Sequence, residues 1–305
     1  MILLYVLTNY LDGLPIASYT TKSTDDLYIV TNVANERPSL PYRTETGGIG
    51  AVGVPEYICV DLGSSKVVTF VGIFNHNFTQ MQAANDSLLL KGCDSDCATC
   101  VWTAPPACTT DLQTLPTDPC DECVGEQPIE NFKNLWHKID CVADHQYWRL
   151  EMIDTTNTNG HLEIGELVLG QWQQFPRGIL DSPASDAWVR LSPGRVDGPE
   201  FFMGKDRTHW GQDWSTYYSE YERFDLVLTT QNDPCIVDAI HTFLKAVQLA
   251  GGRFVLVPDD SKPFCYYAIV DNLRDYAERK IYGRTRELRE WRFKLKSLTE
   301  GVKLL

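Results

Sequence analysis

The sequence predicts a mainly β protein with two domains: an N-terminal β-sandwich, and a small β-barrel or sandwich that carries one packed α-helix. Three observations lead to this prediction. Short apolar segments of strand type fill residues 1–172, residues 173–199 are rich in Pro and Gly, and one clear helical pattern lies at residues 234–250. A chain of 305 residues is long enough for two domains that each have a core.

The first domain is predicted from short strands separated by Gly, Asn, Asp and Pro, without a convincing helix. This spacing is typical of a β-sandwich. The strand segments are YICVDLG, VVTFVGIF, SLLLKG, YWRLEMI and ELVLGQW. Residues 93–128 interrupt the pattern with Cys, Pro, Asp and Thr, so we expect them to form a long insertion between two strands.

The second domain, residues 200–305, is predicted to follow a linker at residues 173–199. Its helix has Asp233 as N-cap, Pro234 in the first turn and Gly251–Gly252 as the stop. Its apolar residues share one face, so the helix should pack on a sheet. These residues are Ile236, Ile240, Phe243, Leu244 and Val247.

The charge distribution argues against a nucleic-acid partner. The formal net charge is -14, whereas nonspecific binding to nucleic acid needs clustered Lys and Arg. Residues 273–305 contain ten Lys and Arg against five Asp and Glu, a net charge of +5 that leaves -19 for residues 1–272. This basic segment could pair with acidic surfaces of neighbouring subunits, or its charges could protect a solvated edge strand.

The N-terminus, MILLYVL, lacks the basic residues of a signal peptide, so we interpret it as a retained first strand. No apolar stretch approaches the roughly 20 residues of a membrane span. We therefore expect synthesis in the cytoplasm and no membrane span.

Five segments follow one another in a characteristic order: RPSLPYRT (residues 37–44), VDLGS (60–64), VGIFNHNF (71–78), YWRL (147–150) and EIGELVLG (163–170). Together they resemble the discoidin-like, or galactose-binding-like, domain at the front of some tailed-bacteriophage tail proteins. The second half resembles the β-barrel-plus-helix module of tail-tip and distal tail proteins. The likeness covers most of the chain outside residues 93–128.

The resemblance implies a structural virion protein of a siphophage-like tail tip or baseplate, made in the host cytoplasm and without catalysis. Its expected partners are other tail proteins (tube, hub and tape measure) and further copies of itself in a ring. Common catalytic motifs such as G-x-S-x-G, H-E-x-x-H and Walker A are absent from the sequence.

An aromatic run suits a contact between subunits, because Trp and Tyr bury a large area at low entropic cost. The same rings could instead pack on the protein's own helix. The run comprises Trp210, Trp214, Tyr217, Tyr218 and Tyr221.

The alternative function is a carbohydrate-binding module or adhesin that contacts host surface glycans through the first domain. Asn75, His76 and Asn77 are the candidate contacts at the end of a strand, although such side chains more often cap the backbone of their own turn. Calcium is a second candidate ligand of this domain, through the oxygens of Asp154, Asn157, Asn159, Glu163 and Glu166.

Cysteines of the insertion are the strongest chemical signal, and two interpretations of them remain open. Two close pairs, Cys97/Cys100 and Cys120/Cys123, could supply four thiolates to a zinc ion. We favour disulfides, because the insertion lacks a core of its own and a virion meets an oxidising environment. The candidate disulfide cluster is Cys93, Cys97, Cys100, Cys108, Cys120 and Cys123. Cys59, Cys141, Cys235 and Cys265 are predicted to be buried single thiols.

Overall fold

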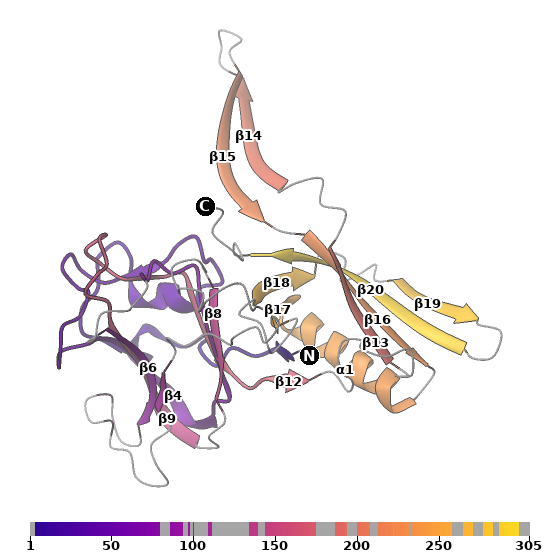
Figure 1. The fold of residues 1–305 in the computed structure, drawn as a ribbon, viewed down its shortest axis with the longest axis horizontal. Coiled ribbons are helices and arrows are strands. Elements are labelled where there is room, and N and C mark those ends of the chain that lie inside the picture. The colour runs from indigo at the N-terminus through magenta and orange to yellow at the C-terminus, as the bar shows by residue number, and fades with distance from the viewer. Residues whose placement is uncertain are drawn as a thin grey trace, which may run out of the picture.

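The fold is that of a computed structural model, shown in Figure 1. The structure describes residues 4–79, 86–93, 97, 100, 109–111, 134–139, 144–174, 187–193, 200–207, 213–221, 223–231, 234–257, 265–270, 277–282 and 287–298. Two sheet assemblies, a separate β-hairpin and one α-helix contain most of these residues, which confirms the predicted mainly β fold class.

The first assembly, called the front sandwich below, consists of a five-stranded sheet facing a three-stranded sheet. The five-stranded sheet has the order β2 (Tyr19–Thr21), β4 (Glu56–Val67), β9 (Asp144–Ile153), β6 (Ser87–Cys93), β7 (Thr109–Asp111). The three-stranded sheet has the order β11 (Glu166–Gly170), β5 (Phe70–Phe74), β8 (Asn134–Lys138). A two-stranded ribbon, β3 (Tyr42–Arg43) with β10 (Glu163–Ile164), and two 3-10 turns, Ile16–Ser18 and Val30–Ala34, complete it.

Alternating side chains of both sheets form the core of the front sandwich, as strands with one buried face require. Ile58, Val60 and Trp148 come from the large sheet, and Ile73 and Leu167 from the small one, all at most 1% exposed. The apolar run VVTFVGIF, predicted as one strand, is divided between the end of β4 and the whole of β5. The chain therefore passes from one sheet to the other at residues 68–69.

The second assembly, called the second sheet below, has eight strands and one helix. Its order is β12 (Gln173–Gln174), β1 (Leu4–Val6), β17 (Arg253–Val257), β18 (Tyr266–Val270), β20 (Glu287–Ser297), β16 (Arg223–Gln231), β13 (Ala187–Pro193), with β19 (Ala277–Tyr282) paired to β20. Helix α1 (Pro234–Leu249) packs on it through Ile240, Phe243, Leu244 and Val247. The prediction of this helix is confirmed, and Gly251 and Gly252 adopt positive φ at its end as a glycine stop requires.

Two predicted boundaries need correction. Residues 173–199 are not simply a linker, because β13 lies within them and pairs with β16 over seven residues. Pro193 is tolerated there because β13 is an edge strand of the described sheet. In addition, β1 belongs to the second sheet, where it lies between β12 and β17, so residues 1–172 do not form one self-contained sandwich.

The three-stranded sheet is apolar on both faces, because its outer face is covered by the second sheet. Phe70, Phe74 and Val168 on that face share a buried cluster with Val255 and Tyr267 of the second sheet. The rings of Phe74 and Tyr267 have centroids 5.5 Å apart. The two assemblies therefore meet through a hydrophobic layer.

A long hairpin extends away from both assemblies, as Figure 1 shows. It consists of β14 (Glu200–Arg207) and β15 (Asp213–Tyr221), and in the described part of the chain neither strand pairs with any other strand. Among the described residues, no helix is long and apolar enough to cross a membrane.

Candidate functional site

The turn that follows β5 is held by its own asparagines. Asn75 has φ 54°, and its Nδ2 donates to the carbonyl oxygen of Pro38 at 2.6 Å. Gly165 crosses this turn so closely that a Cβ there would lie 2.9 Å from the Asn75 Cβ, which explains the glycine. The turn is thus fixed against residues from two distant parts of the sequence.

Asn77 joins the turn to the segment that leads into β10. Its Nδ2 donates to the carbonyl oxygen of His161 at 2.9 Å, and its Oδ1 accepts the backbone N–H of Glu163 at 2.8 Å. The side chain of Asn157 donates to the backbone oxygen of Asn77 at 3.1 Å. Asn77 therefore sets the position of His161 and Glu163.

His76, between the two asparagines, is only 4% exposed. Its Nδ1 accepts the backbone N–H of Phe78 at 3.1 Å, and its ring stacks on that of Phe78 with centroids 4.8 Å apart. The side chains of Asn75, His76 and Asn77, predicted as glycan contacts, are thus engaged with the protein's own backbone and rings.

Beside this turn, four partly exposed side chains form a compact surface cluster, called the β3–β10 cluster below. Glu163 forms an ion pair with Arg43, and its Oε1 lies 3.0 Å from the Nε2 of His161. The guanidinium carbon of Arg43 lies 3.9 Å from the centroid of the Tyr28 ring. The cluster combines a cation, a carboxylate, an imidazole and an aromatic ring.

The loop behind the β3–β10 cluster is organised around Asp154, which is fully buried. Its oxygens accept hydrogen bonds from the backbone N–H of Thr79 at 2.9 Å, from the Thr79 hydroxyl at 2.5 Å and from the Asn157 amide at 3.2 Å. These donors satisfy a carboxylate that would otherwise be costly to bury.

The five residues predicted as calcium ligands do not form one oxygen-lined site, although Asn157 contacts Asp154. Asp154 is engaged by hydrogen-bond donors, Glu163 by Arg43, and Glu166 lies on the strand face that meets the second sheet. Within the described ranges, no group of three or more His, Cys, Asp or Glu side chains is placed to hold a metal ion.

Cysteines of the insertion form two disulfides, Cys59–Cys97 and Cys93–Cys100. The zinc alternative is therefore wrong for Cys97 and Cys100, whose sulfurs are bonded to other cysteines, and the favoured disulfide interpretation is confirmed for Cys93, Cys97 and Cys100. Cys59 was predicted to be a single thiol, and this is wrong because its sulfur is bonded to Cys97. It lies on the outer face of β4, next to the start of the insertion. Cys108, Cys120, Cys123 and Cys141 lie outside the described residues, and Cys265 is a buried free thiol.

Four of the five residues predicted for a subunit contact lie on β15 of the projecting hairpin: Trp214, Tyr217, Tyr218 and Tyr221. Trp210 lies outside the described residues.

Comparison with known proteins gives structural similarities alone. No protein-family model and no curated protein matches the chain. Among solved structures, the family 32 carbohydrate-binding module of C. perfringens NanJ, in complex with galactose, is 14% identical with a TM-score of 0.34, covering 56% of this chain and 100% of its own. The lectin domain of lectinolysin, complexed with Lewis B antigen, is 14% identical with a TM-score of 0.35, covering 54% of this chain and 96% of its own.

A third similar structure is chitosan-binding module 1 of a chitosanase/glucanase from Paenibacillus sp. IK-5. It is 14% identical with a TM-score of 0.34, covering 54% of this chain and 99% of its own. At this level of similarity, functional inference depends on the residues of this chain itself.

Sequence reasoning did not identify the β3–β10 cluster. Arg43 and Glu163 are 120 positions apart and become neighbours only through the two-residue pairing of β3 with β10. Such a short ribbon leaves almost no alternation in the sequence to detect. The only sequence feature that could have indicated the cluster was the position of EIGELVLG directly after a loop rich in Asn and Thr.

Proposed function

We propose that this protein is a structural subunit of a tailed-phage tail tip or baseplate, and that it joins neighbouring subunits through the β14–β15 hairpin. One observation carries the assembly part of this proposal. The hairpin pairs eight register positions, yet in the described part of the chain it has no third strand. An isolated two-stranded ribbon is at best marginally stable in water, so an extended one calls for a partner surface.

The virion part of the proposal comes from the sequence resemblance to tail proteins. The composition of β15 supports an assembly role, because DWSTYYSEY is rich in the residue types that are enriched at protein interfaces. A hairpin that binds a different surface on the next copy makes a head-to-tail contact, and such contacts close into rings when the rotation permits.

Removal of the hairpin tests the assembly role. Residues 200–221 are replaced by a short Gly-Ser linker, and the mass of the purified protein is measured by light scattering across a concentration series. We expect the wild type to form oligomers and the variant to remain monomeric while still unfolding in a cooperative thermal transition. Val52→Ala, at a position 65% exposed in the front sandwich, is the control. Equal oligomers from both proteins, or a wild type that is monomeric throughout, would contradict the proposal.

A second candidate function is glycan binding by the front sandwich, and the β3–β10 cluster favours it. Sugars are recognised by polar groups that hydrogen-bond hydroxyls together with an aromatic ring that packs against C–H groups. Tyr28, Arg43, His161 and Glu163 supply these groups within one patch, and Asn77 holds two of them in place.

A glycan array probed with the full-length protein tests this function. The full chain is used because β1 lies in the second sheet. We expect binding to a limited set of glycans, lost in Glu163→Gln and His161→Ala and retained in Asp144→Asn, an exposed carboxylate at the start of β9. Absence of binding by the wild type, or equal binding by all variants, would reject glycan recognition but leave the assembly role untouched.

A further inference from the structure

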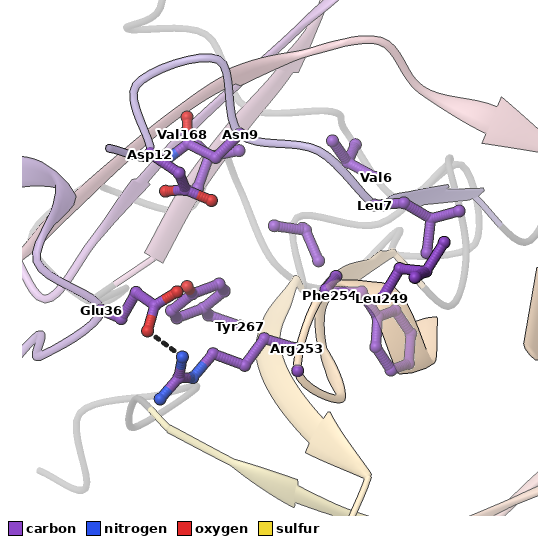
Figure 2. A pocket seen from close by; sticks show the side chains of 13 residues that line it. Val6, Leu7, Asn9, Asp12, Glu36, Val168, Leu249, Arg253, Phe254 and Tyr267 are labelled. Atoms are coloured by element: carbon purple, nitrogen blue, oxygen red, sulfur yellow. Dashed lines mark hydrogen bonds and ion pairs between the residues drawn. The ribbon is translucent and has the colours of Figure 1, made fainter. Parts of the chain in front are cut away.

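A pocket of about 360 Å³ lies where the N-terminal strand, β11 and the second sheet meet, as Figure 2 shows. Its walls come from β1 and the residues that follow it, from β11, from the end of α1 and from β17 and β18. Its volume lies within the range of small-molecule sites in proteins, roughly 300–1,000 Å³.

The two ends of this pocket differ in chemistry. Figure 2 shows Leu7, Leu249 and Phe254 gathered at one end. Asp12, Glu36, Arg253 and Tyr267 lie at the other end, and Asn9 is close to Asp12. An occupant should therefore have an apolar part and a polar part.

The polar end carries an excess of negative charge. Arg253 is the one cation among the lining residues, and it forms an ion pair with Glu36. Asp12 has no ion-pair partner among the described residues, so two carboxylates face one guanidinium, a net charge of -1. The Asp12 side chain reaches solvent, so the carboxylate is accessible from outside.

A third carboxyl group, that of Glu166, lies next to this end. Glu166 is on the same face of β11 as Val168, which lines the pocket, and it is 0% exposed. Neither of its carboxyl oxygens has a hydrogen-bond partner in the described part of the chain. Burial, with the charge of Asp12 as the smaller cause, raises the pKa of Glu166 to about 9. Buried polar groups normally have hydrogen-bond partners, so the carboxyl group of Glu166 indicates a partner that the described residues do not supply.

We infer that the pocket binds an organic cation, a primary ammonium on a short aliphatic chain, with the ammonium at Asp12 and the chain against Leu7, Leu249 and Phe254. The ammonium donates to the Asp12 carboxylate, which has no ion-pair partner among the described residues, and the methylene groups cover the apolar wall, as they do along a lysine side chain. The same chemistry comes from two sources: a free diamine, or a lysine side chain of another protein chain.

Titration of the full-length protein at low salt, followed by NMR chemical shifts or calorimetry, tests this inference. The probes are butylammonium, putrescine and N-acetyl-lysine methylamide, with 1-butanol and butyrate as uncharged and anionic controls. We expect saturable binding of the amines and none of the controls. Tighter binding of the lysine derivative than of putrescine assigns the source to a protein side chain, and the reverse order assigns it to a free polyamine.

The Asp12→Asn variant should weaken amine binding roughly tenfold or more, because a hydrogen bond to a charged group is lost. Asp26→Asn, at an exposed position outside the pocket, should change nothing. Equal affinity of Asp12→Asn and wild type would overturn the inference, as would equal binding of butylammonium and 1-butanol.

The pH dependence of the wild type provides a test that needs no variant. Burial raises the pKa of Asp12 to about 6, although Arg253 and a hydrogen bond with Asn9 lower it. The other groups that interact with Asp12 are Tyr19, Glu166 and Tyr267. Amine binding should therefore weaken as the pH falls from 7 to 5, and binding that is unchanged over this range would contradict a role for Asp12.

Discussion

The Oδ1 atom of Asn77 accepts the backbone N–H of Glu163 at 2.8 Å and so connects two segments that are 86 positions apart. The Nδ2 atom of the same side chain donates to the carbonyl oxygen of His161. One amide thus provides hydrogen-bond partners for two backbone groups at the start of β10.

Replacement of this amide should be costly. We expect Asn77→Ala to lower the free energy of unfolding by about 2 kcal/mol, because two backbone groups lose their partners. Asn159→Ala, an exposed residue of the neighbouring loop, should stay within about 0.5 kcal/mol of the wild type. Urea denaturation followed by fluorescence measures both. Equal stability of the two variants would show that water replaces the amide without loss.

The two disulfides should contribute unequally to stability. Cys59–Cys97 joins residues 38 positions apart and Cys93–Cys100 residues 7 apart. In the chain-entropy model these separations correspond to about 4 and about 2 kcal/mol, although the loops overlap and the two values are not additive. Urea midpoints of Cys59→Ala/Cys97→Ala and of Cys93→Ala/Cys100→Ala, compared with reduced and oxidised wild type, measure this difference. A larger loss from the second pair would contradict the expected order.

Stability should fall as the pH rises, because of Glu166. Burial raises the pKa of this carboxyl in the folded protein to about 9 from its ordinary value of 4.5, so the folded state holds a proton that the unfolded state releases. The contribution is fully present below about pH 4.5, falls by up to about 1.4 kcal/mol per pH unit, and levels off above about pH 9.

Glu166→Gln should raise stability at pH 8 and remove the slope above about pH 6, because the amide stays neutral. Below about pH 6 the raised pKa of Asp12 keeps part of the slope in both proteins. Thermal unfolding from pH 4.5 to 9 measures the effect, with Glu45→Gln as the exposed control. Parallel pH profiles for wild type and Glu166→Gln would show that the carboxyl finds a stabilising partner when it ionises.

Gly72 should be sensitive to the addition of a single methyl group. A Cβ at this position would lie 2.7 Å from the Phe74 Cε2 and 3.0 Å from the Phe70 Cε1, two rings of the layer between the front sandwich and the second sheet. We expect Gly72→Ala to destabilise the protein by about 1–3 kcal/mol through overpacking. Val52→Ala serves as the exposed comparison. A Gly72→Ala variant with wild-type stability would mean that both rings can move aside.

The sequence alone determined the local structure where capping residues, helical periodicity or strand alternation were pronounced. The glycine stop of α1 and its apolar face appear as predicted, because capping and helical periodicity act within a few residues. The paired strands of the front sandwich followed from alternation and turn residues for the same reason. The linker prediction was wrong where Pro and Gly surround β13, since flanking turn residues do not reveal a seven-residue edge strand between them.

Only the tertiary structure decided which distant residues meet. It placed β1 in the second sheet, bonded Cys59 to Cys97, brought Arg43 to Glu163 and set Asp12 close to Glu166. Periodicity states which face of a strand is buried but not which strand or sheet covers it, because each apolar face can be buried against many others with similar free energy. Residues of the candidate sites depend on that choice of partner, and so they appear only once the chain has folded.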